Sequence, residues 1–347
     1  MAERVAILGA GAMGSALTAP AVDAGNETRL WGTWLDDELV AAVRAGAPHP
    51  RTSVVVDARV RAFGCDELEA ALRDATIVVL AITSDGVLDV LAHAAPHLPA
   101  GAPVVITTKG FGRDDGGRVG VIPPRLEAAV PGVAPVVAIG GPCKANEVAA
   151  RRPTASVYGC RDRAAASRAA VVFSTPRYRV EVSDDVVGLE TVAAMKNVYA
   201  IALGACQGLA PRGGEPWHNL QAAVFARAVA EMAVLAGAVG GRHDTAYGLV
   251  GVGDLEVTGR SGRNKVYGER LGRGEAPADA LREMRDAGQV VEGVPAAGLA
   301  RELAAQLAGD GHLQTGVLPL LDAVLDLIGP GADPAERLSA ACLPPAV

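Results

Sequence analysis

Residues 5–14 read Val-Ala-Ile-Leu-Gly-Ala-Gly-Ala-Met-Gly, an apolar run followed at once by a Gly-x-Gly-x-x-Gly pattern. The apolar run predicts a buried strand. The glycines permit a tight turn into a helix whose first N–H groups can approach a pyrophosphate closely. Such a pattern is weak when it stands alone. Its place between a strand and a helix, at the start of a β/α alternation, predicts a dinucleotide site at Gly9, Gly11 and Gly14.

The β/α alternation continues through the first half of the chain. Further strands are predicted at 28–31, 77–82, 104–108 and 136–139, with two more around 155–158 and 178–182 at the far edge. Continuous apolar strands separated by amphipathic helices indicate a parallel sheet covered on both faces. From about Asp185 the pattern is nearly all helical, with helices expected at 188–204, 219–239, 276–286 and 314–328.

We therefore expect an α/β N-terminal doubly wound (Rossmann) domain over residues 1–184, followed by an all-α substrate-binding domain over residues 185–347. The helix expected at 219–239 carries Arg227 and Glu231 at the i, i+4 spacing of an ion pair.

Composition excludes several classes of function. A net charge of −7 and an aromatic content of 3% argue against a nucleic-acid partner, which would need basic patches and stacking platforms. The five cysteines form no Cys-x-x-Cys spacing, so neither a metal site nor disulfides are predicted. We find no signal peptide and no apolar stretch that looks long enough to span a bilayer, so we expect a cytoplasmic protein without membrane insertion.

Lysine occurs at only four positions, Lys109, Lys144, Lys196 and Lys265. Lys196 lies in an apolar helical stretch, where desolvation would lower the pKa of its amine toward neutrality and suit it to proton donation. The alternative is a lysine whose head stays in water. Lys109 directly follows a strand, at the edge of the sheet where ligands bind. For Lys144 and Lys265 we expect ordinary solvated side chains.

A polar loop over residues 251–264 gathers Asp254, Thr258, Ser261, Arg263 and Asn264. A guanidinium can bind a phosphate with two parallel hydrogen bonds, while a carboxylate can orient an ammonium. This set suits a phosphorylated polyol, although a simple polar turn would account for it equally well.

The cofactor cannot be chosen from the second strand. No acid follows it directly to bind a ribose 2′-hydroxyl, and Asp36 and Asp37 are expected inside the next helix as N-terminal charges. With Arg29 and Thr33 close by, NADPH is acceptable, so NADPH and NADH both stay open.

Taken together, these segments resemble the NAD(P)-dependent glycerol-3-phosphate dehydrogenase family over nearly the whole chain. The matching motifs are Gly9-x-Gly11-x-x-Gly14, Lys109-Gly110, Gly141-Pro142-x-x-Ala145-x-Glu147, Lys196-Asn197-Val198, Gly253-Asp254-Leu255-x-x-Thr258, Arg263-Asn264 and Val291-Glu292-Gly293. The resemblance implies reversible reduction of dihydroxyacetone phosphate to sn-glycerol 3-phosphate, a step of glycerophospholipid and carbohydrate metabolism. It also implies a homodimer.

The resemblance assigns roles to individual residues. Lys196 would transfer the proton, Lys109 would stabilise the developing alkoxide, and Asp254 would orient Lys196. The implied substrate-binding residues are Lys109, Gly141, Cys143, Lys196, Asn197, Asp254, Thr258, Gly262, Arg263 and Asn264. The implied cofactor-binding residues are Gly9, Gly11, Ala12, Met13, Gly14, Lys109, Ala145, Arg263, Val290 and Glu292.

Some positions depart from the family pattern. Ala12 and Met13 stand where many bacterial members carry Ser and Trp, and Cys143 stands where the family usually has a small hydroxyl residue or alanine. With Lys144 beside it, this turn could favour another keto-polyol phosphate. Dehydrogenases of β-hydroxyacids share the glycine-rich start but lack the block from Asp254 to Asn264. A non-catalytic dinucleotide sensor would need none of the lysine and carboxylate set.

Overall fold

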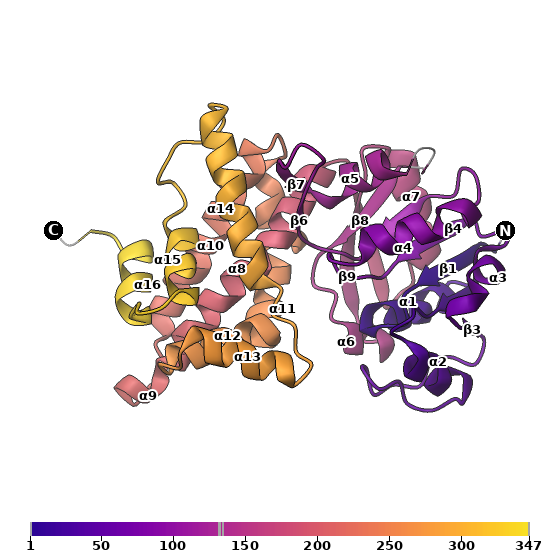
Figure 1. The fold of residues 1–347 in the computed structure, drawn as a ribbon, viewed down its shortest axis with the longest axis horizontal. Coiled ribbons are helices and arrows are strands. Elements are labelled where there is room, and N and C mark those ends of the chain that lie inside the picture. The colour runs from indigo at the N-terminus through magenta and orange to yellow at the C-terminus, as the bar shows by residue number, and fades with distance from the viewer. Residues whose placement is uncertain (1, 131–132, 134, 346–347) are drawn as a thin grey trace. The chain divides into compact units, whose positions relative to one another are not determined.

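The computed structural model describes residues 2–130, 133 and 135–345, and these form two compact units (Figure 1). Unit 1 comprises Met1–Lys109 and Val121–Val186, and unit 2 comprises Gly110–Gly120 and Val187–Val347. A single domain boundary was expected between residues 184 and 185. It did not predict that residues 110–120 belong to unit 2. Each unit is described by itself.

Unit 1 is built on an eight-stranded sheet with the order β10-β9-β8-β5-β4-β1-β2-β3. The strands are β1 (Arg4–Leu8), β2 (Glu27–Trp31), β3 (Arg61–Phe63), β4 (Ile77–Leu80), β5 (Val104–Ile106), β8 (Val136–Gly140), β9 (Thr154–Gly159) and β10 (Tyr178–Ser183). All neighbouring pairs are parallel except β8 and β9, which pair antiparallel. The expected parallel sheet is thus correct up to β8, and its last two strands run the other way. The short strand β3 was not predicted.

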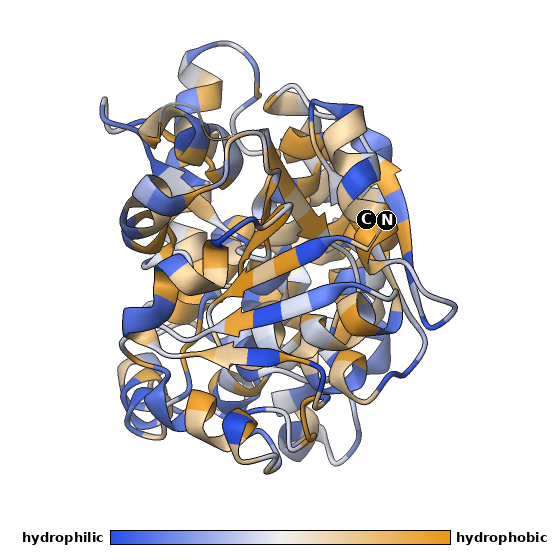
Figure 2. Ribbon diagram, turned by 90° about the vertical axis from the view of Figure 1, so that its right-hand side faces the viewer, coloured by the Kyte–Doolittle hydropathy of each residue, from blue (hydrophilic) through white to orange (hydrophobic). Residues whose placement is uncertain are grey.

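Helices cover both faces of this sheet because the strand order reverses at β1. Right-handed crossovers from β1 to β2 and from β4 to β5 run in opposite directions, so α1 and α4 lie on opposite faces. The helices of unit 1 are α1 (Ala12–Asp23), α2 (Asp37–Arg44), η1 (Cys65–Glu67), α3 (Leu68–Leu72), α4 (Val87–Ala94), η2 (Ala95–His97), α5 (Ile122–Ala129), α6 (Ala145–Ala149) and α7 (Arg163–Phe173). Figure 2 shows hydrophobic residues along the strands between these layers, as a sheet buried on both faces requires. The doubly wound fold is confirmed.

Unit 2 is helical apart from one hairpin. Its helices are α8 (Val186–Gly208), α9 (Ala210–Gly213), α10 (His218–Ala238), η3 (His243–Tyr247), the π-helical η4 (Leu249–Gly253), α11 (Asp254–Arg260), α12 (Arg263–Gly272), α13 (Pro277–Asp286), α14 (Gly293–Gly309), α15 (Pro319–Ile328) and α16 (Pro334–Cys342). The helix expected from residue 314 begins only at Pro319, because proline's fixed φ suits the first helical position.

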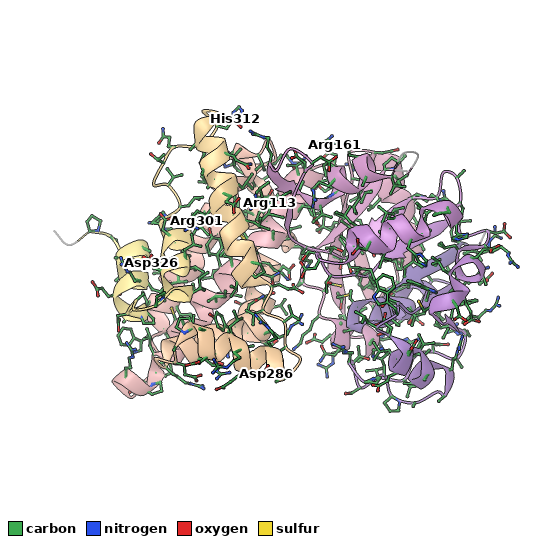
Figure 3. All side chains as sticks on the ribbon, in the orientation of Figure 1. Arg113, Arg161, Asp286, Arg301, His312 and Asp326 are labelled. Atoms are coloured by element: carbon green, nitrogen blue, oxygen red, sulfur yellow. The ribbon has the colours of Figure 1, made fainter. Side chains whose placement is uncertain are left out.

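The hairpin of unit 2 consists of β6 (Phe111–Arg113) and β7 (Val119–Val121), which pack on α14. Arg113, labelled in Figure 3, is ion-paired to Glu302 of α14 at 2.6 Å. The Val119 N–H donates to Gln306 Oε1 at 2.9 Å, and the Val119 carbonyl oxygen accepts from Gln306 Nε2 at 3.2 Å. These contacts bind residues 110–120 to the helical unit.

The expectation that no apolar stretch is long enough to span a bilayer is not met by two helices. Val186–Gly213 and His218–Ala238 could each cross a membrane by length and composition alone. However, 94% of the apolar window in the first is buried within the protein. Burial inside a helical unit explains the apolar sequence of this first helix without a lipid environment, while the apolar window of the second is 50% buried.

Helices α8 and α12 cross at direct backbone contact because each carries a glycine that faces the backbone of the other helix. A Cβ at Gly204 would lie 2.1 Å from the Lys265 carbonyl oxygen, and one at Gly268 would lie 2.0 Å from that of Ile201. Any side chain at these positions would force the helices apart. The crossing brings the N-terminus of α12 beside the middle of α8.

Glu231 on α10 is buried, with 1% of its surface exposed. Its carboxylate accepts hydrogen bonds from the Tyr199 hydroxyl at 2.8 Å and from the Leu320 and Leu321 N–H groups at 2.7 and 3.0 Å. Glu231 therefore caps the first turn of α15, whereas its i, i+4 spacing from Arg227 is that of an ion pair. Burial, the largest cause, raises the pKa of Glu231 to about 7.

Candidate active site

The glycine-rich turn between β1 and α1 is shaped to receive a phosphate group. Gly9 has a φ of +105°, and a Cβ at Gly14 would lie 1.9 Å from the Gly9 carbonyl oxygen, so both positions require glycine. A Cβ at Gly11 would meet nothing within 4 Å, which leaves space above the turn. No side chain caps α1 and its first turn holds no acid, so its N-terminus suits a pyrophosphate.

Two side chains that were not predicted from the sequence, Asp36 and His49, support this turn. Ala10 N–H donates to Asp36 Oδ2 at 3.2 Å, and the Ala10 carbonyl oxygen lies 2.9 Å from His49 Nε2. Asp36 precedes α2 instead of lying inside it, because its Oδ2 also accepts hydrogen bonds from the Thr33 N–H and hydroxyl, both at 2.9 Å. The Arg29 guanidinium donates to the Arg73 carbonyl oxygen and to the Glu27 carboxylate. It is therefore held by groups of the protein itself and not by a cofactor.

A second group of predicted residues lies at the carboxyl ends of β5 and β8. Lys109 Nζ donates to the Gly141 carbonyl oxygen at 3.5 Å. Gly141 has a φ of +95°, so the turn into α6 requires glycine there. The Cys143 sulfur lies 3.6 Å from the Tyr178 hydroxyl and is partly exposed. Ala145 is the first residue of α6, and Lys144 is its N-cap.

Unit 2 holds the predicted proton-transfer group. Lys196 Nζ donates to Asp254 Oδ1 at 2.5 Å and to Thr258 Oγ1 at 3.1 Å. Lys196 is 8% exposed and Asp254 is 1% exposed. Burial disfavours an ammonium and an adjacent carboxylate favours it, so Asp254 stabilises the protonated amine in a dry setting. The expectation from the sequence rested on desolvation and did not include this opposing effect of the carboxylate.

Backbone irregularity sets the position of Asp254. The π-helical turn η4 ends one residue before it, and Gly253 N–H bonds to the Gly248 carbonyl oxygen at 3.2 Å. A Cβ at Gly251 would lie 1.9 Å from the Ala246 carbonyl oxygen, so the turn depends on glycine. Such wide turns are frequent at functional sites because they redirect the following residue.

A hydrogen-bonded chain of amides extends this cluster. Asn264 Nδ2 donates to Asn197 Oδ1 at 3.0 Å, while Asn264 Oδ1 accepts from the Gly293 N–H at 2.9 Å. Asn197 Nδ2 in turn donates to Glu292 Oε2 at 3.4 Å. Arg263, whose side chain is 46% exposed, pairs with Glu292 Oε1 at 3.5 Å. The predicted residues of α8, α11, α12 and the start of α14 thus meet in one cluster.

The remaining predicted residues lie beside this cluster or outside it. Gly262 is the N-cap of α12 with a φ of +140°, and Val290 is 53% exposed just before the Glu292 segment. Lys265, expected to be solvated, is only 14% exposed and pairs with Glu269 on its own helix. Among the described residues, no group of His, Cys, Asp or Glu is arranged to hold a metal.

The chain is similar to known proteins over most of its length. The family models described as NAD-dependent glycerol-3-phosphate dehydrogenase N-terminus and C-terminus match residues 4–166 and 185–339. The NADP(+)-dependent glycerol-3-phosphate dehydrogenase of Archaeoglobus fulgidus is 38% identical over 91% of this chain and 94% of its own length. The NAD(P)+ glycerol-3-phosphate dehydrogenase of Mesorhizobium japonicum is 35% identical over 93% of this chain and 89% of its own length.

Among solved structures, the glycerol-3-phosphate dehydrogenase of Coxiella burnetii superposes with a TM-score of 0.80 at 27% identity, covering 98% of both chains. The family expected from the sequence is therefore confirmed. The chain belongs to the NAD-dependent glycerol-3-phosphate dehydrogenase family and is an NAD(P)-dependent oxidoreductase.

Proposed function

We propose that the protein reversibly reduces dihydroxyacetone phosphate to sn-glycerol 3-phosphate with NADH or NADPH. The observation that carries this proposal is the buried contact of Lys196 with Asp254 and Thr258. A cofactor-binding turn alone would need none of these three side chains. Their retention together supports chemistry rather than cofactor sensing.

Lys196 acts as the acid in reduction. When bound, the nicotinamide supplies the hydride that adds to C2 of the ketone. Lys196 Nζ donates a proton to the C2 oxygen as the alkoxide develops, and in oxidation the neutral amine takes the hydroxyl proton back. A positioned acid–base group is worth roughly 10²–10⁴-fold in rate. Asp254 and Thr258 hold the Nζ atom in place while the proton moves.

The phosphate of the substrate binds at the N-terminus of α12. Gly262 caps this helix without a side chain, and Arg263 is its first residue with an exposed guanidinium. A helix N-terminus and a guanidinium both favour a phosphate. Asn264 and Asn197, joined by their hydrogen bond, place the substrate hydroxyls near Lys196.

Unit 1 binds the cofactor and supplies a second positive charge, that of Lys109. Gly9 allows the tight turn, and its N–H is bound to the Trp31 carbonyl oxygen, so the N–H groups of Gly11, Ala12, Met13 and Gly14 bind the pyrophosphate. The family resemblance assigns Ala145, Arg263, Val290 and Glu292 to the nicotinamide end. The family resemblance assigns Lys109, Gly141 and Cys143 to the substrate, where the Lys109 ammonium would stabilise the developing alkoxide. This proposal treats residues 1–184 as the cofactor domain and residues 185–347 as the substrate domain.

The test uses two lysines that both contact a carboxylate. Lys196→Met should leave NADH binding unchanged and lower kcat by at least 100-fold, because it removes the proton donor. Lys265→Met is the matched control, since Lys265 also pairs with an acid on a helix and has no role in the reaction. NADH and NADPH absorbance at saturating dihydroxyacetone phosphate gives the rate and the cofactor ratio. Near-normal turnover of Lys196→Met would remove Lys196 from proton transfer.

A second substrate has one observation in its favour. Lys144 and Cys143 lie in the turn after Gly141, and an added ammonium there suits a longer or more anionic keto-polyol phosphate. Catalytic efficiencies with dihydroxyacetone phosphate and with longer ketose phosphates distinguish the two.

We also propose a cytoplasmic homodimer without membrane insertion, supported by the family resemblance and by the burial of α8. Light scattering on the purified protein gives its mass in solution.

A further inference from the structure

The residues beneath the glycine-rich turn are placed to control cofactor affinity. We propose that His49 is a positioning residue for cofactor binding, which together with Asp36 clamps Ala10 and fixes the turn that receives the pyrophosphate. The inference rests on the cofactor site proposed above. It concerns two residues that touch the turn from below and are not themselves cofactor contacts.

The clamp uses both polar atoms of Ala10. The residue is fully buried, its N–H donates to Asp36 Oδ2 at 3.2 Å, and its carbonyl oxygen lies 2.9 Å from His49 Nε2. Gly9 N–H donates to the Trp31 carbonyl oxygen at 2.8 Å. Glycines on both sides of Ala10 make an unsupported turn flexible. Because Ala10 is held from two sides, the turn is already ordered before the cofactor binds, and less conformational entropy is lost on binding.

The hydrogen bonds of His49 define its tautomer. Arg51 N–H donates to His49 Nδ1 at 3.2 Å, so Nε2 carries the proton and donates to the Ala10 carbonyl. The ring is fully buried, and burial, the largest cause, lowers the pKa of His49. The segment around it turns back on the same residue, because the His49 carbonyl oxygen accepts the N–H groups of Thr52 and Ser53. A neutral donor is therefore built into the base of the turn.

Asp36 completes the clamp from the other side. Its Oδ2 atom accepts the N–H and hydroxyl of Thr33 in addition to the N–H of Ala10. An acid near the end of the second strand often binds the ribose of NAD, but this oxygen is directed at the protein's own backbone. The clamp should thus act on the pyrophosphate, which NADH and NADPH share.

Two substitutions separate the clamp from general packing. His49→Asn keeps an acceptor near the place of Nδ1 and removes the donor to Ala10, whereas His49→Gln puts an amide donor near the place of Nε2. We expect His49→Asn to raise the Kd values of NADH, NADPH and ADP-ribose about tenfold each, because it leaves the Ala10 carbonyl unpaired. His49→Gln should stay within about threefold of wild type, and kcat at saturating cofactor should hold in both.

Binding is measured by nucleotide fluorescence and calorimetry, without substrate, next to thermal unfolding of each variant. The Kd values thus hold whether or not dihydroxyacetone phosphate is the substrate. His97→Asn is the matched control, since His97 is exposed in the same unit. If His49→Asn does not fold, Asp36→Ala removes the opposite side of the clamp and should give the same loss.

Three results would overturn the proposal. Equal weakening by His49→Asn and His49→Gln would make His49 a packing residue only. A lowered unfolding temperature with unchanged Kd values would have the same meaning. A loss confined to NADPH would place the action of His49 at the adenosine ribose, away from the pyrophosphate turn.

Discussion

Replacing Glu231 with glutamine should change how the stability of unit 2 depends on pH. The pKa of Glu231 is raised from 4.5 to about 7 because the carboxylate is buried, and the hydrogen bonds from Leu320, Tyr199 and Leu321 oppose this only in part. A carboxyl group whose pKa is higher in the folded state binds more protons there than in the unfolded chain. Its contribution to stability is therefore complete below pH 4.5 and is lost as the pH rises through about 7.

The magnitude follows from the shift. Each pKa unit corresponds to 1.36 kcal/mol, so Glu231 should lower the free energy of unfolding by about 2 to 3 kcal/mol between pH 5 and pH 8. Glu231→Gln has no such titration. The difference in stability between wild type and variant should therefore shrink, or change sign, across this interval.

The assay is urea unfolding followed by the fluorescence of Trp217, the N-cap of α10, with Trp31 and Trp34 replaced by phenylalanine. Glu336→Gln serves as control because Glu336 is exposed. A wild-type-minus-variant difference that stays constant from pH 5 to pH 8 would refute the reasoning, since Glu231 would then not titrate in this range.

Two further predictions concern the site and its support. Gly268→Ala should destabilise unit 2 by about 3 kcal/mol or more, because the new methyl group meets the Ile201 carbonyl oxygen at 2.0 Å. Gly298→Ala, where a Cβ meets nothing within 4 Å, should be neutral or stabilising by up to about 1 kcal/mol, and thermal unfolding compares the two. Thr258→Val removes the hydroxyl that accepts from Lys196 Nζ, so kcat should fall about tenfold while the Kd of NADH stays constant. A kcat within twofold of wild type would show that Asp254 alone positions the lysine.

Much of the fold followed from local patterns. Apolar runs between helical stretches predicted seven strands of the sheet, and the glycine pattern predicted the turn after β1. The strand β3 was missed because its three residues, Arg61–Phe63, are too few to show an alternation. The hairpin over residues 110–120 was missed because its partner, α14, lies far along the chain.

The site was predicted unevenly for a similar reason. Lys196, Asp254 and Thr258 carried a family pattern, and α8 and α11 bring them together. His49 gave no signal, because a single histidine in a turn-rich segment has no periodicity and its partner is a main-chain carbonyl. For Glu231 the signal was misleading. Its spacing from Arg227 within α10 could not indicate that its carboxylate binds the N-terminus of α15. Contacts with backbone atoms of distant segments leave no mark on sequence.

The excursion of residues 110–120 has a practical consequence for dissecting the enzyme. The chain passes between the units three times, after Lys109, after Gly120 and after Val186, so neither unit is a continuous piece of sequence. A fragment that starts at Val187 would expose the face of α14 that the hairpin covers and would lose the partners of Glu302 and Gln306. Expressing unit 2 as a folded protein would therefore require residues 110–120 to be joined to it, for example by a short linker ahead of Val187.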